Sequence, residues 1–146
     1  MDHILSMIGL ARKAGRVEVG EEPTGAAARA KKARIILLAC DAAPSTRRRA
    51  AAFAQVGGCP LLTLDADKEQ LGGILGKPGV AMAAVTDIGF ADAIVKKLAA
   101  KDPETYGDVS AQLARKAMRA QERRQEKARH EKNLRTGRKR GSHKTN

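Results

Sequence analysis

Aromatic side chains are scarce in this 146-residue chain, which has no tryptophan and only Phe53, Phe90 and Tyr106. Domains that bind single-stranded nucleic acid on a sheet platform or in an oligonucleotide-binding barrel stack bases on exposed rings. Three rings in the whole chain exclude base stacking as the main means of recognition. Any contact with nucleic acid must depend on cationic side chains and on the backbone.

Cysteine is equally scarce. Cys40 and Cys59 form no CxxC pair and have no histidine near them in the sequence, so they lack the spacing of a metal site. Cys40 ends an apolar run, which predicts a buried, reduced thiol. A disulfide between the two would need an oxidising compartment.

Segments that would direct the chain into or across a membrane are also missing. The first residues, MDHILSMIGLARKAG, place an acid at position 2, and their basic residues follow the short apolar run instead of preceding it. A signal peptide has the opposite order. No run approaches the roughly 20 apolar residues of a membrane span. These features predict a cytoplasmic protein without a membrane partner.

Catalytic motifs are absent: the chain contains no GxSxG, GxxxxGK[ST], HExxH or GxGxxG. Asp41, Asp65 and Asp67 stand near predicted strand ends, where α/β enzymes keep acids, but no base or nucleophile accompanies them. Asp67 is better explained as a helix cap, and the glycines of residues 71–79 as a loop. We expect no enzyme, no cofactor and no metal. A nucleotide-binding enzyme or an RNA-modification subunit remains the alternative.

Positive charge is what the chain has in excess. It carries 28 Lys and Arg against 16 Asp and Glu, and residues 111–146 alone have a formal net charge of +10. Such a block predicts an arm for a polyanion, because each cation placed on a phosphate releases counterions. The alternatives are a solvated tail, or docking on an acidic protein partner. The candidate contacts in this segment are Arg115, Lys116, Arg119, Arg123, Arg124, Arg138, Lys139 and Arg140.

Apolar periodicity over the first hundred residues predicts alternating helices and strands. We expect helices at about 4–14, 21–32, 45–56 (with Ser45 as cap), 67–71 and 90–98, and strands at 16–19, 35–40, 61–64 and 80–86. The run 35–40 is apolar on both faces, which is typical of a strand covered by helices on both sides. The order predicts an α/β fold, with one sheet between layers of helices.

The chain divides into three parts on composition. Asp102-Pro103 and Gly107 are breakers, which predicts a domain over 1–100 and a linker over 101–110. Residues 111–133 are rich in strong helix formers but have no apolar stripe wide enough to dock. The tail 111–146 is therefore expected to be a solvated helix that becomes disordered from Thr136 onward.

Three segments carry a specific resemblance. LARKAGRVEVGEEPTGAAARAKKARIILLACDAAPSTRRR is followed by CPLLTLDADKEQLGGILGK and then by VAMAAVTDIGFADAI. Together they resemble the kink-turn-binding ribosomal protein family, "L-seven-Ae" spelled out, and more narrowly its bacterial YlxQ-like branch. The resemblance covers about Ile4 to Leu98. It implies a three-layer α/β/α sandwich with a small mixed sheet. We expect this domain to bind ribosomal RNA without catalysis, and to be a monomer outside any ribonucleoprotein complex.

The resemblance also implies an RNA-facing surface in three parts. One is the Gly20 turn with the helix start that follows it. Another is the helix start after Asp41, expected at the same end of the sheet. The third is the loop at the end of strand 80–86 or the turn that precedes this strand, at Gly79. The residues implied, with nearby cations that could add affinity, are Gly20, Glu21, Glu22, Thr24, Arg29, Lys31, Lys32, Thr46, Arg47, Arg48, Val85 and Thr86.

The resemblance has one departure. Kink-turn binders carry Gly-x-Asn-Glu followed by a lysine, whereas this chain has Glu22, Pro23 and Ala26 at the matching positions. An ionised Glu can only accept hydrogen bonds, and Pro has no N–H to donate. We therefore expect RNA binding with little preference for a kink-turn.

Overall fold

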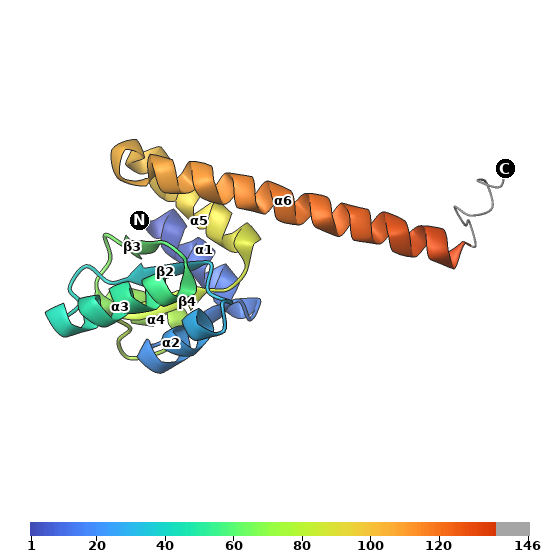
Figure 1. Ribbon diagram of the computed structural model, residues 1–146. Coiled ribbons are helices and arrows are strands. Elements are labelled where there is room, and N and C mark those ends of the chain that lie inside the picture. The colour runs from blue at the N-terminus through green and yellow to red at the C-terminus, as the bar shows by residue number, and fades with distance from the viewer. Residues whose placement is uncertain (137–146) are drawn as a thin grey trace.

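The computed structural model describes residues 1–136, which form an α/β body and one long projecting helix (Figure 1). The elements in order are α1 (Asp2–Lys13), β1 (Val17–Val19), α2 (Glu21–Arg29), β2 (Ile35–Leu38), α3 (Pro44–Gly57), β3 (Leu61–Thr63), α4 (Lys68–Leu75), β4 (Met82–Val85), α5 (Ile88–Lys101) and α6 (Pro103–Arg135).

The four strands form one mixed sheet in the order β1-β4-β2-β3. Strand β4 pairs antiparallel with both β1 and β2, and β2 pairs parallel with β3. Strands β1, β2 and β3 therefore point the same way. We call the end of the sheet where these three strands finish the carboxyl end, and the opposite end the amino end. Helices α2, α3 and α4 begin at the carboxyl end.

The two central strands, β2 and β4, are buried on both faces, as the apolar run 35–40 predicts. Successive residues of a strand point to opposite faces of the sheet. One set packs with α1, α4 and α5, and the other with α2 and α3, so the molecule has three layers. The first set is Ile35, Leu37, Ala83 and Val85, and the second is Ile36, Leu38, Met82 and Ala84.

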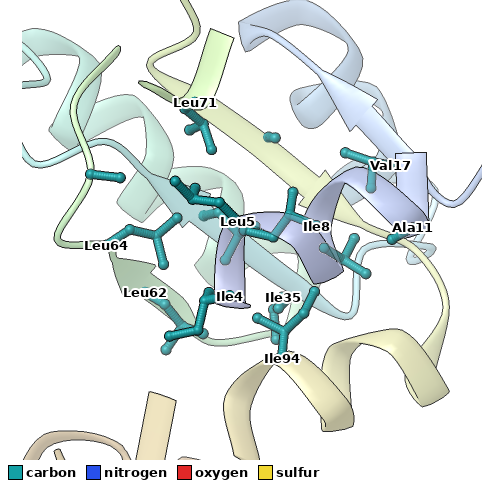
Figure 2. Close-up of a cluster of buried hydrophobic side chains, with 14 of the residues drawn as sticks. Ile4, Leu5, Ile8, Ala11, Val17, Ile35, Leu62, Leu64, Leu71 and Ile94 are labelled. Atoms are coloured by element: carbon teal, nitrogen blue, oxygen red, sulfur yellow. The ribbon is translucent and has the colours of Figure 1, made fainter. Parts of the chain in front are cut away.

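Helix α1 places its apolar stripe on the larger of these two cores (Figure 2). Ile4, Leu5, Ile8 and Ala11 recur at helical spacing and are all buried. Figure 2 shows the four side chains in one cluster with Ile35 of β2 and Ile94 of α5. The expected helix is confirmed, and its apolar face covers one side of the sheet.

The starts of α4 and α3 show whether Asp67 and Ser45 act as the expected helix caps. Asp67 caps α4: its Oδ1 accepts from the N–H of Gln70 at 2.8 Å, and the Asp67 N–H donates to Gln70 Oε1 at 3.0 Å. The cap is confirmed. Ser45 is not a cap, because α3 begins one residue earlier at Pro44, whose fixed φ suits a first helical position. Cys40 is exposed, not buried, because it lies in a turn two residues beyond the end of β2.

Residues 101–110, expected to be a linker, are helical instead. Helix α5 runs to Lys101 and α6 begins at Pro103, with Asp102 between them as its cap. The Asp102 Oδ1 atom accepts from the N–H of Thr105 at 3.2 Å. Asp-Pro here starts a helix rather than ending order, because Pro fits the first helical turn and Asp satisfies a free N–H.

The first part of α6 docks on the body, against expectation. Leu113 is 1% exposed and belongs to the same core as Ile4. Tyr106 and Val109 pack against this core, and the Tyr106 hydroxyl donates to the Thr63 carbonyl at 2.8 Å. Burial raises the pKa of Tyr106. The docking stripe was missed because its spacing, 106, 109 and 113, crosses the expected boundary between linker and tail.

The second part of α6 is solvated, as expected. Every residue from 121 to 132 is exposed, and the helix leaves the body at the amino end (Figure 1). About 15 residues beyond Ala120 extend the helix by about 22 Å at 1.5 Å per residue. The expected disorder from Thr136 onward falls almost wholly on residues 137–146, outside the described residues. No helix within 1–136 is long and apolar enough to cross a membrane.

Glycine 72 allows the loop before β4 to lie on α4. A Cβ atom at this position would stand 2.5 Å from the Lys77 carbonyl oxygen and 3.0 Å from the Gly79 Cα. Both are backbone atoms, so the loop itself would have to move. Gly73, the next residue of the same helix, has no atom within 4 Å of such a Cβ. Gly72 therefore sets the position of residues 77–79.

Replacement of Leu113 tests the docking of α6. Leu113→Ala should lower the free energy of unfolding by about 2 to 5 kcal/mol, because it leaves a cavity in the core. Leu134→Ala in the same helix is the control, since Leu134 is 60% exposed. Its effect should stay within about 0.5 kcal/mol. Urea unfolding measures both, and equal effects would show that α6 is not docked.

Substitutions at the neighbouring residues Gly72 and Gly73 test whether the loop of residues 77–79 packs on α4. Gly72→Ala should destabilise the fold by about 1 to 3 kcal/mol, because the new methyl group meets backbone. Gly73→Ala should stabilise it by about 0.5 to 1 kcal/mol, since alanine loses less entropy than glycine in a helix. Thermal melting of the two variants beside the natural chain gives both signs. Stabilisation by Gly72→Ala would mean that the loop does not rest on α4.

Candidate nucleic-acid interface

The carboxyl end brings two of the expected parts together. Gly20 precedes α2 with φ 100° and donates its N–H to the Met82 carbonyl at 3.0 Å. The starts of α2 and α3 are joined by an ion pair of 3.1 Å between Arg49 Nη1 and Glu21 Oε1. No side chain caps either helix, so N–H groups of their first turns are open to an anion. Both helix starts lie at one end of the sheet, as expected.

The turn before β4 supplies the third part. Because β4 runs against its neighbours, the loop 76–81 lies at the carboxyl end with Gly20. The start of α4 lies there as well, and its Lys68 N–H donates to Asp41 Oδ1 at 2.9 Å. Of the two alternatives for the third part, the preceding turn at Gly79 fits and the loop near Thr86 does not.

Three of the expected contact residues lie away from the open surface of the carboxyl end. Val85 and Thr24 are fully buried, so their side chains are closed to a ligand. Thr86 is half-buried at the amino end, where its hydroxyl donates to the Arg16 carbonyl at 3.2 Å. The cause is again the direction of β4, which carries residues 85 and 86 away from Gly20.

The arginines at the start of α3 differ in their surroundings. Arg47 donates from Nη2 to the Cys40 carbonyl at 2.8 Å, and Arg49 pairs with Glu21. Arg48 is exposed and has no side-chain partner among residues 1–136. Thr46 is partly exposed beside them. Of these three arginines, Arg48 is thus the one available to a ligand without breaking a contact.

The carboxyl end has more acids than bases. Its helix starts and loops carry six acids, Glu21, Glu22, Asp41, Asp65, Asp67 and Glu69, and five bases, Arg47, Arg48, Arg49, Lys68 and Lys77. The enzyme-like acids Asp41 and Asp67 both accept from N–H groups at the start of α4. Their carboxylates thus satisfy backbone N–H groups of the fold. Within residues 1–136 there is also no cluster of His, Cys, Asp and Glu that could hold a metal ion.

The amino end is basic by contrast. Helices α1, α2 and α3 finish there, and some of its cations satisfy those helix ends. Lys31, in a left-handed conformation with φ 60°, donates from Nζ to the Val56 carbonyl at the end of α3. Arg12 donates to the Val17 carbonyl at 3.2 Å. Arg29 lies in the last turn of α2, where a cation complements the helix dipole.

Other cations at the amino end make no such contact. Lys32 is exposed, as are Arg16 and Arg34, two residues that the sequence analysis did not single out. A signal for both was present, since Arg34 stands directly before a predicted strand and Arg16 is the first residue of another. Residues before parallel strands share one end of the sheet. The structure brings Arg16, Lys32 and Arg34 to one open groove of about 610 Å³ between β1 and α2.

The cations of the α6 segment and tail fall into three groups: those beside Arg34, those on other faces of the helix, and those beyond residue 136. Lys116, Arg119 and Arg123 recur at three- and four-residue spacing and face Arg34 across a second groove, of about 270 Å³. Arg115 and Arg124 are exposed on other faces of the helix. Arg138, Lys139 and Arg140 lie outside the described residues. The predicted contacts therefore fall at two ends of the sheet instead of forming one surface.

Comparisons with known proteins agree with this fold. The model of the "Ribosomal protein L7Ae/L30e/S12e/Gadd45 family" matches residues 2–95. A solved structure of a protein with unknown function from Bacillus halodurans C is 25% identical, with a TM-score of 0.59, and the match covers 64% of this chain and 93% of that one. No curated protein matches significantly. With more than half of its residues matched by the family model, the chain belongs to the ribosomal protein L7Ae/L30e/S12e/Gadd45 family.

Proposed function

We propose that this protein binds structured, kink-turn-like RNA, most naturally ribosomal RNA, and catalyses no reaction. The observation that carries the proposal is the unbalanced charge of α6. From Arg115 to Arg135 the helix has nine Lys and Arg against three Glu. In residues 1–136, ion pairs join only Arg49 to Glu21 and Lys96 to Asp92, so none of these nine cations is neutralised by a carboxylate.

Membership of a family described by ribosomal proteins supports RNA as the polyanion. The match ends at residue 95, so α6 adds charge to a domain that the family already defines. We also assign the chain to the YlxQ-like branch on the motifs LAxxAG and AVTDxGFA. In this proposal the protein acts in the cytoplasm and is a monomer when it is not part of a ribonucleoprotein complex.

The two ends of the protein contribute differently to binding. At the carboxyl end, the uncapped starts of α2 and α3 offer N–H groups to phosphate, with Arg48 beside them. Backbone donors need close approach, and Gly20 permits it because it carries no side chain. Helix α6 supplies long-range attraction, which positions RNA without reading its sequence.

Crosslinking in cells tests the proposal. We expect ribosomal RNA to dominate the sequences crosslinked to the natural chain, and a variant that ends at Gln121 to recover much less RNA. This variant keeps Leu113 and so keeps the docked part of α6. In vitro, its plot of log K against log salt should flatten by about 0.7 to 0.9 for each phosphate contact removed.

A truncation after Gly107 would be a poor test, because it would remove Leu113 and expose the core. Recovery of an acidic protein in place of RNA, insensitive to nuclease, would contradict the proposal and favour docking on a protein partner. An unchanged salt slope in the Gln121 variant would show that the projecting part of α6 does not touch RNA.

The residues at the start of α2 predict weak kink-turn preference. Glu22, Pro23 and Ala26 are all exposed, so each is accessible to RNA yet lacks the donors of the family pattern. We expect less than about a tenfold preference, or about 1.4 kcal/mol, for a kink-turn over a plain stem. The triple variant Glu22→Asn, Pro23→Glu, Ala26→Lys should raise it. Titrations of the two RNAs measure the ratio, and strong selectivity in the natural chain would refute this.

A further inference from the structure

Arg34 stands at the junction of two grooves at the amino end of the sheet. One groove runs along α2 beside β1, with Arg16 and Lys32 near Arg34. The other lies between the body and α6. The two grooves share Arg34, so together they make one continuous surface. Its cations lie at the end of the sheet opposite Gly20, while the α2 groove extends along the helix to Pro23.

The groove beside α6 gathers cations without any acid. Its lining consists of Arg34, Lys116, Arg119 and Arg123, with Ile88 and Ala120 as the apolar residues. None of the four cations has an ion-pair partner among residues 1–136. Like charges held around one groove repel one another, and an anion placed between them removes that cost. The arrangement fits a bound anion better than an empty groove.

The charged residues that line the groove beside α2 are also mostly cations. Its other lining residues are small or apolar, namely Pro23, Ala26, Ala27 and Ala30, together with Thr86 and one acid, Glu18. Cations therefore outnumber acids three to one in this groove as well. No aromatic residue lines either groove, so bases cannot stack there.

Neutralisation of helix ends does not explain these cations. Lys31 serves that role, since it donates to the Val56 carbonyl at the end of α3, whereas Arg12 donates to a carbonyl of β1. Arg34 precedes a strand rather than ending a helix, and Lys116 to Arg123 lie in the middle of a 33-residue helix. The dipole effect is confined to the last turn of a helix. These cations are therefore free for a ligand.

We propose that the amino-end surface, formed by Arg16, Lys32 and Arg34 with Lys116, Arg119 and Arg123, is a second RNA-binding site. It binds the phosphate backbone of an RNA duplex without reading sequence. The proposal rests on the proposed function for its class of ligand, and its six cations are distinct from the charged residues of the carboxyl end.

Charge-matched variants of the full chain test this site. The probe is a plain RNA duplex of about 20 base pairs, since a duplex lacks the kinked features expected at the carboxyl end. Arg34→Ala with Arg119→Ala should reduce the salt slope of binding by about 2, or about 1 for each phosphate contact. The control is Lys97→Ala with Lys101→Ala, two exposed cations of α5 on the side of Met1 and His3. It should leave the slope and the affinity nearly unchanged.

A melting curve of each variant confirms that the fold is intact, since all four residues are exposed. Equal losses in the two double variants would overturn the site, because only total charge would then matter. Normal duplex binding by Arg34→Ala with Arg119→Ala would overturn it too, while leaving the proposed function in place. Failure of the natural chain to bind any RNA would instead defeat the proposed function. Equal competition by polyglutamate and by RNA would show a general polyanion surface and overturn the assignment to RNA.

Discussion

The antiparallel placement of β4 between the parallel strands β1 and β2 determines where the charged groups of this protein lie. It brings the loop 76–81 to the carboxyl end, beside Gly20 and the start of α3, and carries Thr86 to the amino end. Helix α5 must then run back toward the carboxyl end, and α6 returns along it. The middle of α6 therefore meets Arg34, and its last turns project beyond the body (Figure 1).

Features set within one element could be predicted from the sequence. The run 35–40 predicts a strand covered on both faces because its apolar residues leave no side for water, and β2 is buried throughout. Asp67 predicts a cap because its side chain can reach an N–H three residues later, which it does. The stripe of α1 follows from helical spacing alone. In each case the physical cause lies within a few residues.

Features that depend on the path of the chain could not be predicted in this way. The sequence Asp102-Pro103 predicts a break in the chain, but it starts α6. Leu113, ten residues after Pro103, is buried in the core and holds this helix on the body. Val85 belongs to a motif of the family, yet its direction is set by strand pairing, which buries it. Arg34 was recognisable as the residue before a strand. Its meeting with Lys116 and Arg119 depends on how α5 and α6 fold back over the sheet.

The division of charge between the two ends gives the proposed complex an order of events. Attraction between α6 and RNA acts over a Debye length of about 8 Å, so the projecting cations meet RNA first. The carboxyl end binds RNA only over short distances, because its donors are backbone N–H groups. The acids around these donors repel any phosphate that does not lie directly on them. Affinity then comes mainly from the amino end and α6, and discrimination from the carboxyl end. A protein built this way binds many RNAs weakly through charge and retains those whose shape brings phosphates onto the starts of α2 and α3.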